Sequence, residues 1–352
     1  MSENTGYTPA SWSADTSFDA ARDYYKNKVT DRGYDTAVSA GTTASDLVEK
    51  KLTTKVRVPI CIFSDQTGSM KKWPEVIFAK LGYLDHEANY YFGEGKWAIG
   101  FGAFGDAHNR ETYPFQIRPF CTGADMKKHL DELVPEGKGG GNMSESGELP
   151  LLYARYNVEA PKAEHPILII ITDEKCYEVI GVDGAKSAGV DLKDRVTTKQ
   201  LIEELRAKGW SIHVILKPYT EVSGDGEADD TRMVRQFWEK LVDPEFVYSL
   251  PDPNRVVDVI FGIFAKVTGM YAEFYKELKD RQLPDKDGAK KVAIVEKALK
   301  KAHAAYLSGD LDTVEADADV KALPAPSKSK LRTGGKVVAD KDSKSLLPDD
   351  DE

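Results

Sequence analysis

The stretch FSDQTGSM, from Phe63 to Met70, follows the apolar run VRVPICI and precedes KKWPEVIFAKL, whose apolar spacing is that of a helix. A nearly continuous apolar run predicts a strand that is covered on both faces. Three oxygen-bearing side chains, Asp65, Thr67 and Ser69, follow where that strand ends. Two interpretations stay open for them: they cap the next helix, or they hold a hard cation.

Apolar runs and helical patterns alternate along most of the chain. Strand-like runs fall at 56–65, 96–106, 165–174 and 210–218, with shorter ones at 111–120 and 245–250. Helical patterns fall at 74–91, 124–134, 197–209, 229–243 and 252–280, and a further helix follows the glycine-rich stretch 135–147. The prolines in 111–120 favour an edge strand there. The alternation predicts an α/β fold, a doubly wound, mostly parallel central sheet with helices on both faces.

The segments outside this alternation divide the chain into four parts. We expect an N-terminal extension at 1–54, the α/β domain at 55–282, a C-terminal helix within 283–308 and a disordered tail at 309–352. The pattern GAKKVAIVEKALKKAHAAYL predicts one helix with an apolar stripe and a lysine-rich face. The tail is poor in aromatic residues and rich in charge, proline, serine and glycine, which is typical of disorder.

Composition narrows the classes of function. The chain of 352 residues has a formal net charge of -10, which argues against broad contact with nucleic acid. Its longest strongly apolar run, PILIII, is too short to span a bilayer. The first residues show no secretory pattern, and the three scattered cysteines, Cys61, Cys121 and Cys176, suggest no disulfide framework. We therefore expect a cytoplasmic protein without a membrane span.

Acidic side chains follow several of the predicted strands. Asp65, Asp106 and Asp173 each follow a strand, and the glycine-rich stretch before Glu145 would reach the same edge of the sheet. Ligands of open α/β sheets bind at this carboxyl edge. With no basic residue close by in sequence, such carboxylates would have raised pKa values unless a cation were present. Oxygen ligands favour Mg²⁺, or Mn²⁺, and the lack of nearby thiolates and imidazoles disfavours zinc and copper.

Two motifs carry a resemblance to a known family. DQTGS, at residues 65–69, is similar to the D-x-S/T-x-S element of the von Willebrand factor A (vWA) domain family, its metal-ion-dependent adhesion site. IIITDE, which contains Asp173, resembles the family's later strand that ends in an Asp. The resemblance covers roughly residues 55–275. It implies that Thr67 and Ser69 contact the metal directly, while Asp65 and Asp173 act mainly through bound waters.

The sequence departs from the family at one ligand. The family's middle element is a Thr that opens a helix after a glycine loop, and GGGNMSESGELPLL has no Thr. Placing Pro150 and Leu151 on the family's helix puts Glu145 at the Thr position, with Ser144 or Ser146 as alternatives after a one-residue shift. Glu145 would add negative charge, strengthen metal binding, and close the coordination position that the family offers to a partner's carboxylate.

These patterns favour one function and leave two alternatives. The resemblance implies an intracellular, non-enzymatic adaptor or scaffold whose Mg²⁺ site captures an Asp or Glu side chain of a protein partner. It further suggests an association with an AAA+ ATPase or a stress-response system. One alternative is a structural component of a larger assembly, such as a phage or secretion particle, with a fold-stabilising metal. The other is a metal-dependent hydrolase that uses Asp106 or Glu145.

A glycine motif raises a different possibility, which the context disfavours. GFGAFG, with Gly100, Gly102 and Gly105, matches the spacing of a dinucleotide-binding loop. That loop must lie between a strand and a helix, and the segment that follows, DAHNRETYPFQIRPF, does not have a helical pattern. We expect these glycines to lie within a strand where another part of the chain packs closely.

Overall fold

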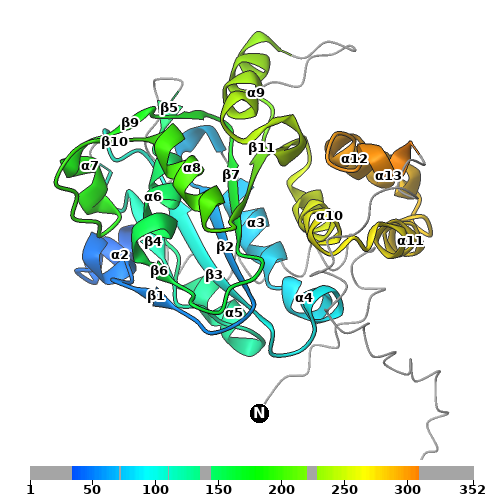
Figure 1. Cartoon of the computed structure of the whole chain (residues 1–352), viewed down its shortest axis with the longest axis horizontal. Helices are drawn as coiled ribbons and strands as arrows, with labels where there is room; N and C mark the ends of the chain where they lie inside the picture. The colour runs from blue at the N-terminus through cyan, green and yellow to red at the C-terminus, as the bar shows by residue number, and fades with distance from the viewer. Residues whose placement is uncertain (1–33, 71–72, 110, 135–143, 220–227, 309–352) are drawn as a thin grey trace, which may run out of the picture.

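The computed structural model describes residues 34–70, 73–109, 111–134, 144–219 and 228–308. Six strands form the central sheet in the order β12-β11-β7-β2-β3-β4. Their bounds are β2 (Val58–Asp65), β3 (Trp97–Phe104), β4 (Phe115–Ile117), β7 (Ile167–Thr172), β11 (Ser211–Leu216) and β12 (Val247–Ser249). Only the β3–β4 pair is antiparallel within this sheet, and β4 lies at its edge. The predicted α/β fold is confirmed (Figure 1).

Helices cover both faces of this sheet. One face packs against α3 (Trp73–Leu81), α4 (Leu84–Phe92), α5 (Ala124–Asp131) and α10 (Val256–Thr268). The other packs against α6 (Glu148–Asn157), α8 (Thr198–Ala207) and α9 (Asp229–Val242). Each face of the sheet thus has its own hydrophobic core. Strand β2 is apolar throughout because its side chains enter both cores, Ile62 on the first face and Phe63 on the other. Each such side chain contributes roughly 1.5–3 kcal/mol when fully buried.

Gly100 and Gly102 of the glycine motif lie within β3, as the sequence predicted, whereas Gly105 directly follows this strand. A Cβ atom added at Gly102 would lie 2.3 Å from the ring of Phe63 and 2.7 Å from the carbonyl oxygen of Gln116. One added at Gly100 would lie 3.0 Å from a methyl group of Leu52. The motif therefore lets β2 and β4 approach β3 closely, and no helix follows it directly.

Three predicted helices were wrong in their extent. The pattern at 74–91 forms α3 and α4, which a turn at residues 82–83 separates. The pattern at 252–280 forms the short turn η5 (Pro253–Arg255), α10 and α11 (Tyr271–Gln282). Gly269 ends α10 in the left-handed conformation, with φ of 74°, which favours glycine. The pattern at 288–307 forms α12 (Gly288–Leu299) and α13 (Ala304–Leu307).

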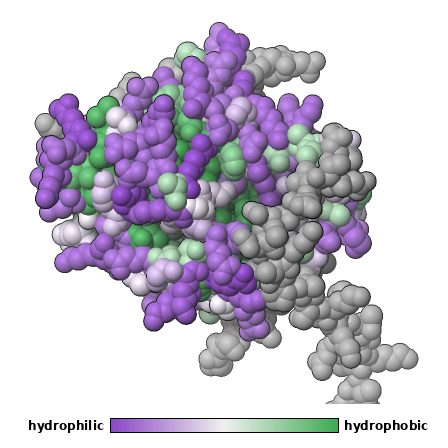
Figure 2. All heavy atoms as spheres, in the orientation of Figure 1, coloured by the Kyte–Doolittle hydropathy of each residue, from purple (hydrophilic) through white to green (hydrophobic). Residues whose placement is uncertain are grey.

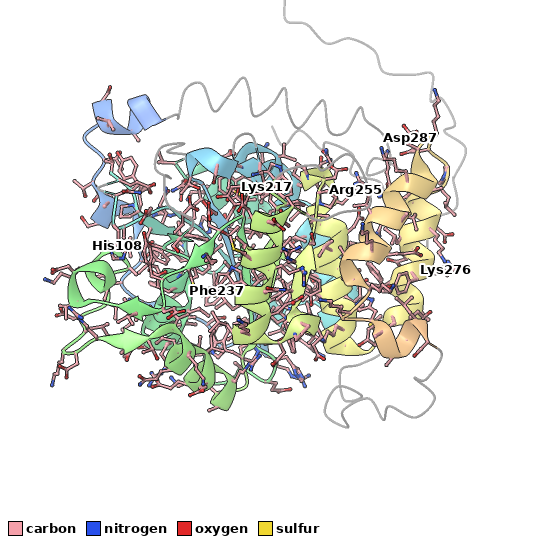
Figure 3. All side chains as sticks on the ribbon, turned by 90° about the horizontal axis from the view of Figure 1, so that it is seen from above. His108, Lys217, Phe237, Arg255, Lys276 and Asp287 are labelled. Atoms are coloured by element: carbon pink, nitrogen blue, oxygen red, sulfur yellow. The ribbon has the colours of Figure 1, made fainter. Side chains whose placement is uncertain are left out.

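These breaks let the C-terminal helices fold back onto α10. The buried guanidinium of Arg281, on α11, lies 3.5 Å from carboxylate oxygens of both Glu87 and Asp258. His303, between α12 and α13, lies 2.9 Å through Nε2 from the carbonyl oxygen of Gly262 and 3.0 Å through Nδ1 from the hydroxyl of Tyr275. In Figure 3 this helical side, marked by Lys276 and Asp287, lies opposite His108.

Shorter elements complete the part of the chain that the structure describes. They are α2 (Tyr34–Ser39), η2 (Ala44–Leu47), β1 (Leu52–Thr53), η3 (Gly68–Met70), β5 (Ser144–Glu145), β6 (Val158–Glu159), β8 (Lys175–Cys176), β9 (Val179–Ile180), α7 (Val182–Ser187), β10 (Val196–Thr197) and η4 (Pro244–Phe246). No apolar or helical pattern predicts the elements found within 179–196, which are β9, α7 and the start of β10. The expected tail at 309–352, residues 1–33 of the expected extension and 135–143 of the glycine stretch lie outside the described residues.

The described part of the expected extension lies on the α/β domain. The hydroxyl of Tyr113 donates to the carbonyl of Thr42 at 3.0 Å, and that of Tyr153 donates to the carbonyl of Glu49 at 2.6 Å.

Figure 2 shows a mostly hydrophilic surface on this view, with apolar side chains visible between the polar ones. No described helix combines the length and the apolar character that crossing a membrane requires.

Candidate metal centre

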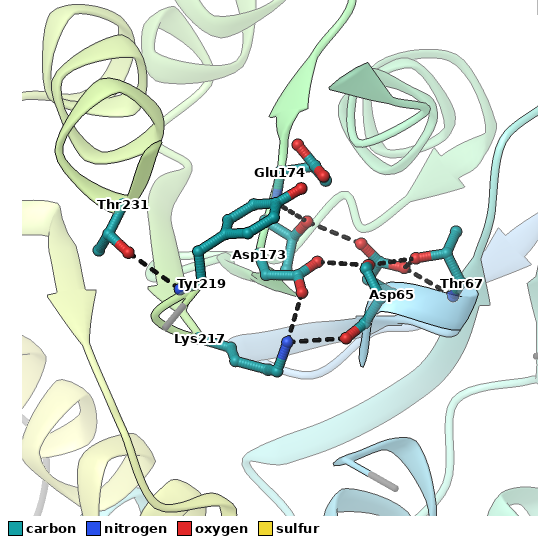
Figure 4. Close-up of polar contacts among 9 residues, drawn as sticks. Asp65, Thr67, Asp173, Glu174, Lys217, Tyr219 and Thr231 are labelled. Carbon is teal, nitrogen blue, oxygen red and sulfur yellow. Dashed lines mark hydrogen bonds and ion pairs between the residues drawn. The ribbon is translucent and has the colours of Figure 1, made fainter. Parts of the chain in front are cut away.

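The turn after β2 is built around the carboxylate of Asp65. One oxygen, Oδ1, accepts hydrogen bonds from the backbone N–H of Thr67 at 2.9 Å and from its hydroxyl at 2.8 Å. The other, Oδ2, accepts from the hydroxyl of Thr172 at 2.8 Å (Figure 4). The hydroxyls of Thr67 and Ser69 lie 3.1 Å apart. The polar residues at spacing i, i+2, i+4 therefore converge at the carboxyl edge of the sheet.

The residue after β7 joins this turn from the neighbouring strand. The hydroxyl of Ser69 donates to Oδ1 of Asp173 at 2.9 Å. Strands β2 and β7 are parallel neighbours, so their carboxyl ends meet at the same edge. Asp65, Thr67 and Asp173 are all buried, while Ser69 is half-buried and Gly68 is exposed. Gly68 and Ser69 are therefore the most accessible part of the turn.

Glu145 reaches the site through a separate two-stranded sheet. Strand β5 pairs in parallel with β8, which begins two residues after Asp173, and Glu145 lies opposite Cys176. One carboxylate oxygen from each of Asp65, Glu145 and Asp173 lies within 4.8 Å of the other two. The structure thus brings together all five residues that the sequence proposed as ligands.

The electrostatics of the three carboxylates favour a compensating cation. Burial first, and then the negative charge of Asp65, raise the pKa of Glu145 to about 12. The same two causes raise the pKa of Asp173. Neither carboxylate oxygen of Glu145 has a hydrogen-bond partner among the described residues, and its side chain is fully buried. A buried carboxylate without a partner is unfavourable, and a divalent cation would offset that cost.

The donor set fits a hard cation. The group of potential ligands in the described chain consists of three carboxylates, with no imidazole or thiolate among them. The hydroxyls of Thr67 and Ser69 add two neutral oxygen ligands beside them. Oxygen-only sites of this kind suit hard divalent cations.

The secondary candidates lie beside the site and have other contacts. Asp106 accepts from the backbone N–H of His108 at 2.9 Å, the amide of Asn109 at 2.7 Å and the hydroxyl of Tyr177 at 3.2 Å. It does not belong to the three-carboxylate group. Asp106 therefore orders its own loop.

The two serines beside Glu145 differ in their surroundings. Ser146 is buried, and its hydroxyl accepts from the backbone N–H of Ala107 at 3.0 Å. Ser144 is half-buried in β5, opposite Lys175. Of the three positions that the alignment left open, Glu145 is therefore the one whose side chain joins Asp65 and Asp173.

Sequence reasoning missed Lys217, although it contacts two of the candidate ligands. Its ammonium nitrogen lies 2.5 Å from Oδ2 of Asp173 and 2.8 Å from the carbonyl oxygen of Ser69. Lys217 lies far from these carboxylates along the chain, and the fold brings its ammonium to them. Lys217 directly follows β11, the parallel neighbour of β7, so the shared carboxyl edge of these strands was the signal that could have identified it.

Solved structures of other proteins resemble part of this chain. No protein-family model matches the chain, and no curated protein matches it. One similar solved structure is the pilus adhesin SpaC from Lactobacillus rhamnosus GG in its open conformation, with 12% sequence identity and a TM-score of 0.42; it covers 62% of this chain and 31% of the adhesin chain. Another is proximal thread matrix protein 1 from the mussel byssus with a zinc-occupied MIDAS motif, with 15% identity and a TM-score of 0.38.

The mussel protein match covers 60% of this chain and 48% of that one. The chain therefore spans less than half the length of both structures. Similarity this distant leaves the function to be argued from the geometry of the site.

Proposed function

We propose that this chain is an intracellular vWA-like protein-binding module, without enzymatic activity of its own, whose carboxyl edge is organised by Mg²⁺ or Mn²⁺. Asp65, Thr67, Ser69, Asp173 and Glu145 would hold the ion. The observation that supports this most strongly is the buried carboxylate of Glu145, which lies beside two further carboxylates and has no hydrogen-bond partner within the described part of the chain. When bound, the ion would supply positive charge that a protein partner can recognise.

The accessible part of the turn indicates where a partner would approach. Gly68 is exposed and Ser69 half-buried, whereas the three carboxylates are buried. In this proposal, Glu145 helps to hold the ion without filling the position open to a partner, and an Asp or Glu side chain of the partner approaches the ion past Ser69 and completes its coordination. The surrounding surface would then contribute the remaining specificity.

A second candidate function is a structural scaffold with a resident metal. The complete burial of Asp65 and Glu145 favours it, because a site closed by the chain's own carboxylates needs no ligand from a partner. The hydrolase alternative has less support, since the hydrogen bonds of Asp106 hold a loop.

The experiment compares binding of proteins to the immobilised full chain with Mg²⁺ and with a chelator. Thr67→Ala removes a proposed ligand, and Thr53→Ala, at an exposed position of β1, is the matched control. We expect the wild type and Thr53→Ala to retain a partner protein when Mg²⁺ is present and to lose it with the chelator. Thr67→Ala should not retain this partner under either condition. Retention of the same proteins by all three, with or without Mg²⁺, would overturn the proposal in favour of the scaffold.

A further inference from the structure

Lys217 is placed beside the carboxylates by the register of the sheet. Leu216 lies opposite Thr172 in the β11–β7 pair, so Lys217 and Asp173 follow directly after paired residues. The backbone N–H of Lys217 also donates to the carbonyl of Thr172 at 2.9 Å. Its side chain is only 12% exposed. A long, flexible cation is therefore held in a fixed place against the site.

The ammonium of Lys217 and the hydroxyl of Ser69 contact different oxygens of Asp173. Ser69 donates its hydroxyl to Oδ1, at 2.9 Å, while Lys217 contacts Oδ2, at 2.5 Å (Figure 4). Lys217 also donates to the carbonyl of Ser69 at 2.8 Å, which fixes the backbone of the turn. The ammonium of Lys217 and the hydroxyl of Ser69 thus occupy different oxygens of the same carboxylate.

Charge balance gives this arrangement a consequence. Three buried carboxylates, Asp65, Glu145 and Asp173, give the site three negative charges when all are ionised. Lys217 offsets one of them, and a divalent cation offsets the other two. The site would be neutral with both cations present, so Lys217 matches the charge that Glu145 adds to the family pattern.

We propose that Lys217 is a built-in counter-ion of this site, which stabilises the metal-free turn and weakens divalent-cation binding so that the ion exchanges readily. The inference rests on the proposed metal function. Two cations in one partly buried site repel each other, which lowers the affinity for the metal. In the absence of the metal, the same ammonium partly compensates the carboxylates, so the turn stays ordered.

The test is calorimetric titration of Mg²⁺ into the chelator-treated full chain. The variants are Lys217→Met, which removes the charge and keeps the apolar stem, and Lys199→Met as the matched control. Lys199 lies on α8 with its side chain 77% exposed, 3.9 Å from Glu203. We expect Lys217→Met to bind Mg²⁺ at least about tenfold more tightly than the wild type does. Lys199→Met should bind Mg²⁺ as the wild type does.

Thermal melting of the same proteins gives an independent readout. Without metal, Lys217→Met should melt at a lower temperature than Lys199→Met, and saturating Mg²⁺ should remove most of the difference. Lys217→Gln, whose amide can still donate to the Ser69 carbonyl, serves if Lys217→Met does not fold. Unchanged or weaker Mg²⁺ binding by the uncharged variants, with normal binding by the wild type, would overturn this inference alone. No binding by the wild type would overturn the proposed function as well.

Discussion

Substituting Gly102 by alanine should disturb the strand that leads into the candidate metal centre. The added Cβ atom would lie 2.3 Å from the ring of Phe63 and 2.7 Å from the carbonyl oxygen of Gln116. An ordinary contact needs about 3.4 Å or more, so the ring must move by roughly 1 Å within a closely packed core. Phe63 precedes Asp65 by two residues on β2, so the displacement would reach the turn.

The expected loss of stability follows from this overlap. Overpacking costs about 1–3 kcal/mol, and we expect the upper end because both a ring and a backbone carbonyl obstruct the new atom. For a domain of this size, about 3 kcal/mol corresponds to a melting temperature lower by roughly 6–12 °C. Calorimetric melting of the purified full chain measures the change.

Gly100 provides a matched control on the same strand. Its added Cβ atom would lie 3.0 Å from the end of the flexible Leu52 side chain, which can move aside. Gly100→Ala should therefore cost about 1 kcal/mol or less. Equal effects of the two substitutions, or a neutral Gly102→Ala, would refute the packing explanation of the glycine motif.

Two further predictions concern the C-terminal helices. Burial lowers the pKa of His303 from 6.5 to about 4. As the pH falls, the unfolded chain therefore protonates this histidine before the folded chain does. Lowering the pH from 6.5 to 4 should remove up to about 3 kcal/mol of folding stability. Urea unfolding across this range should show a flatter pH dependence for His303→Gln, and an unchanged slope would contradict the assignment. Arg281→Met should destabilise the fold by about 3 kcal/mol because it removes a cation near the buried Glu87 and Asp258. Arg206→Met is the control, because Arg206 forms a more exposed ion pair with Asp243; this variant should lose about 1 kcal/mol of folding stability or less. Similar losses in both variants would refute the role of burial.

The sequence predicted the central sheet well because its strands are long apolar runs. Strands β2 and β7 are buried along their whole length, and such runs have few alternatives in an α/β chain. Helix ends were harder to predict, because apolar spacing continues across Gly82 and Gly269 while the backbone turns there. Gly269 ends α10 by adopting the left-handed conformation, which the apolar spacing does not reveal.

The candidate site was predictable where its residues are close in sequence or end a strand. Asp65, Thr67 and Ser69 form one turn, and Asp173 follows the next strand of the sheet. Lys217 was not predictable from local spacing, because its contact with Ser69 joins residues 148 positions apart. The contact forms because β11 lies next to β7 in the sheet. A single sequence indicates the order of strands in a sheet only through its resemblance to a family of known fold.

The most direct test of the metal centre is to count the ions that the chain binds. Chelator-treated full chain would be titrated with Mg²⁺ in a calorimeter, beside Asp65→Asn, which keeps the shape of the side chain and removes its charge. Circular dichroism would establish that both proteins are folded. We predict one ion per wild-type chain and none, or much weaker binding, for Asp65→Asn. A folded wild type that binds no ion, or an Asp65→Asn variant that binds it equally well, would contradict the account.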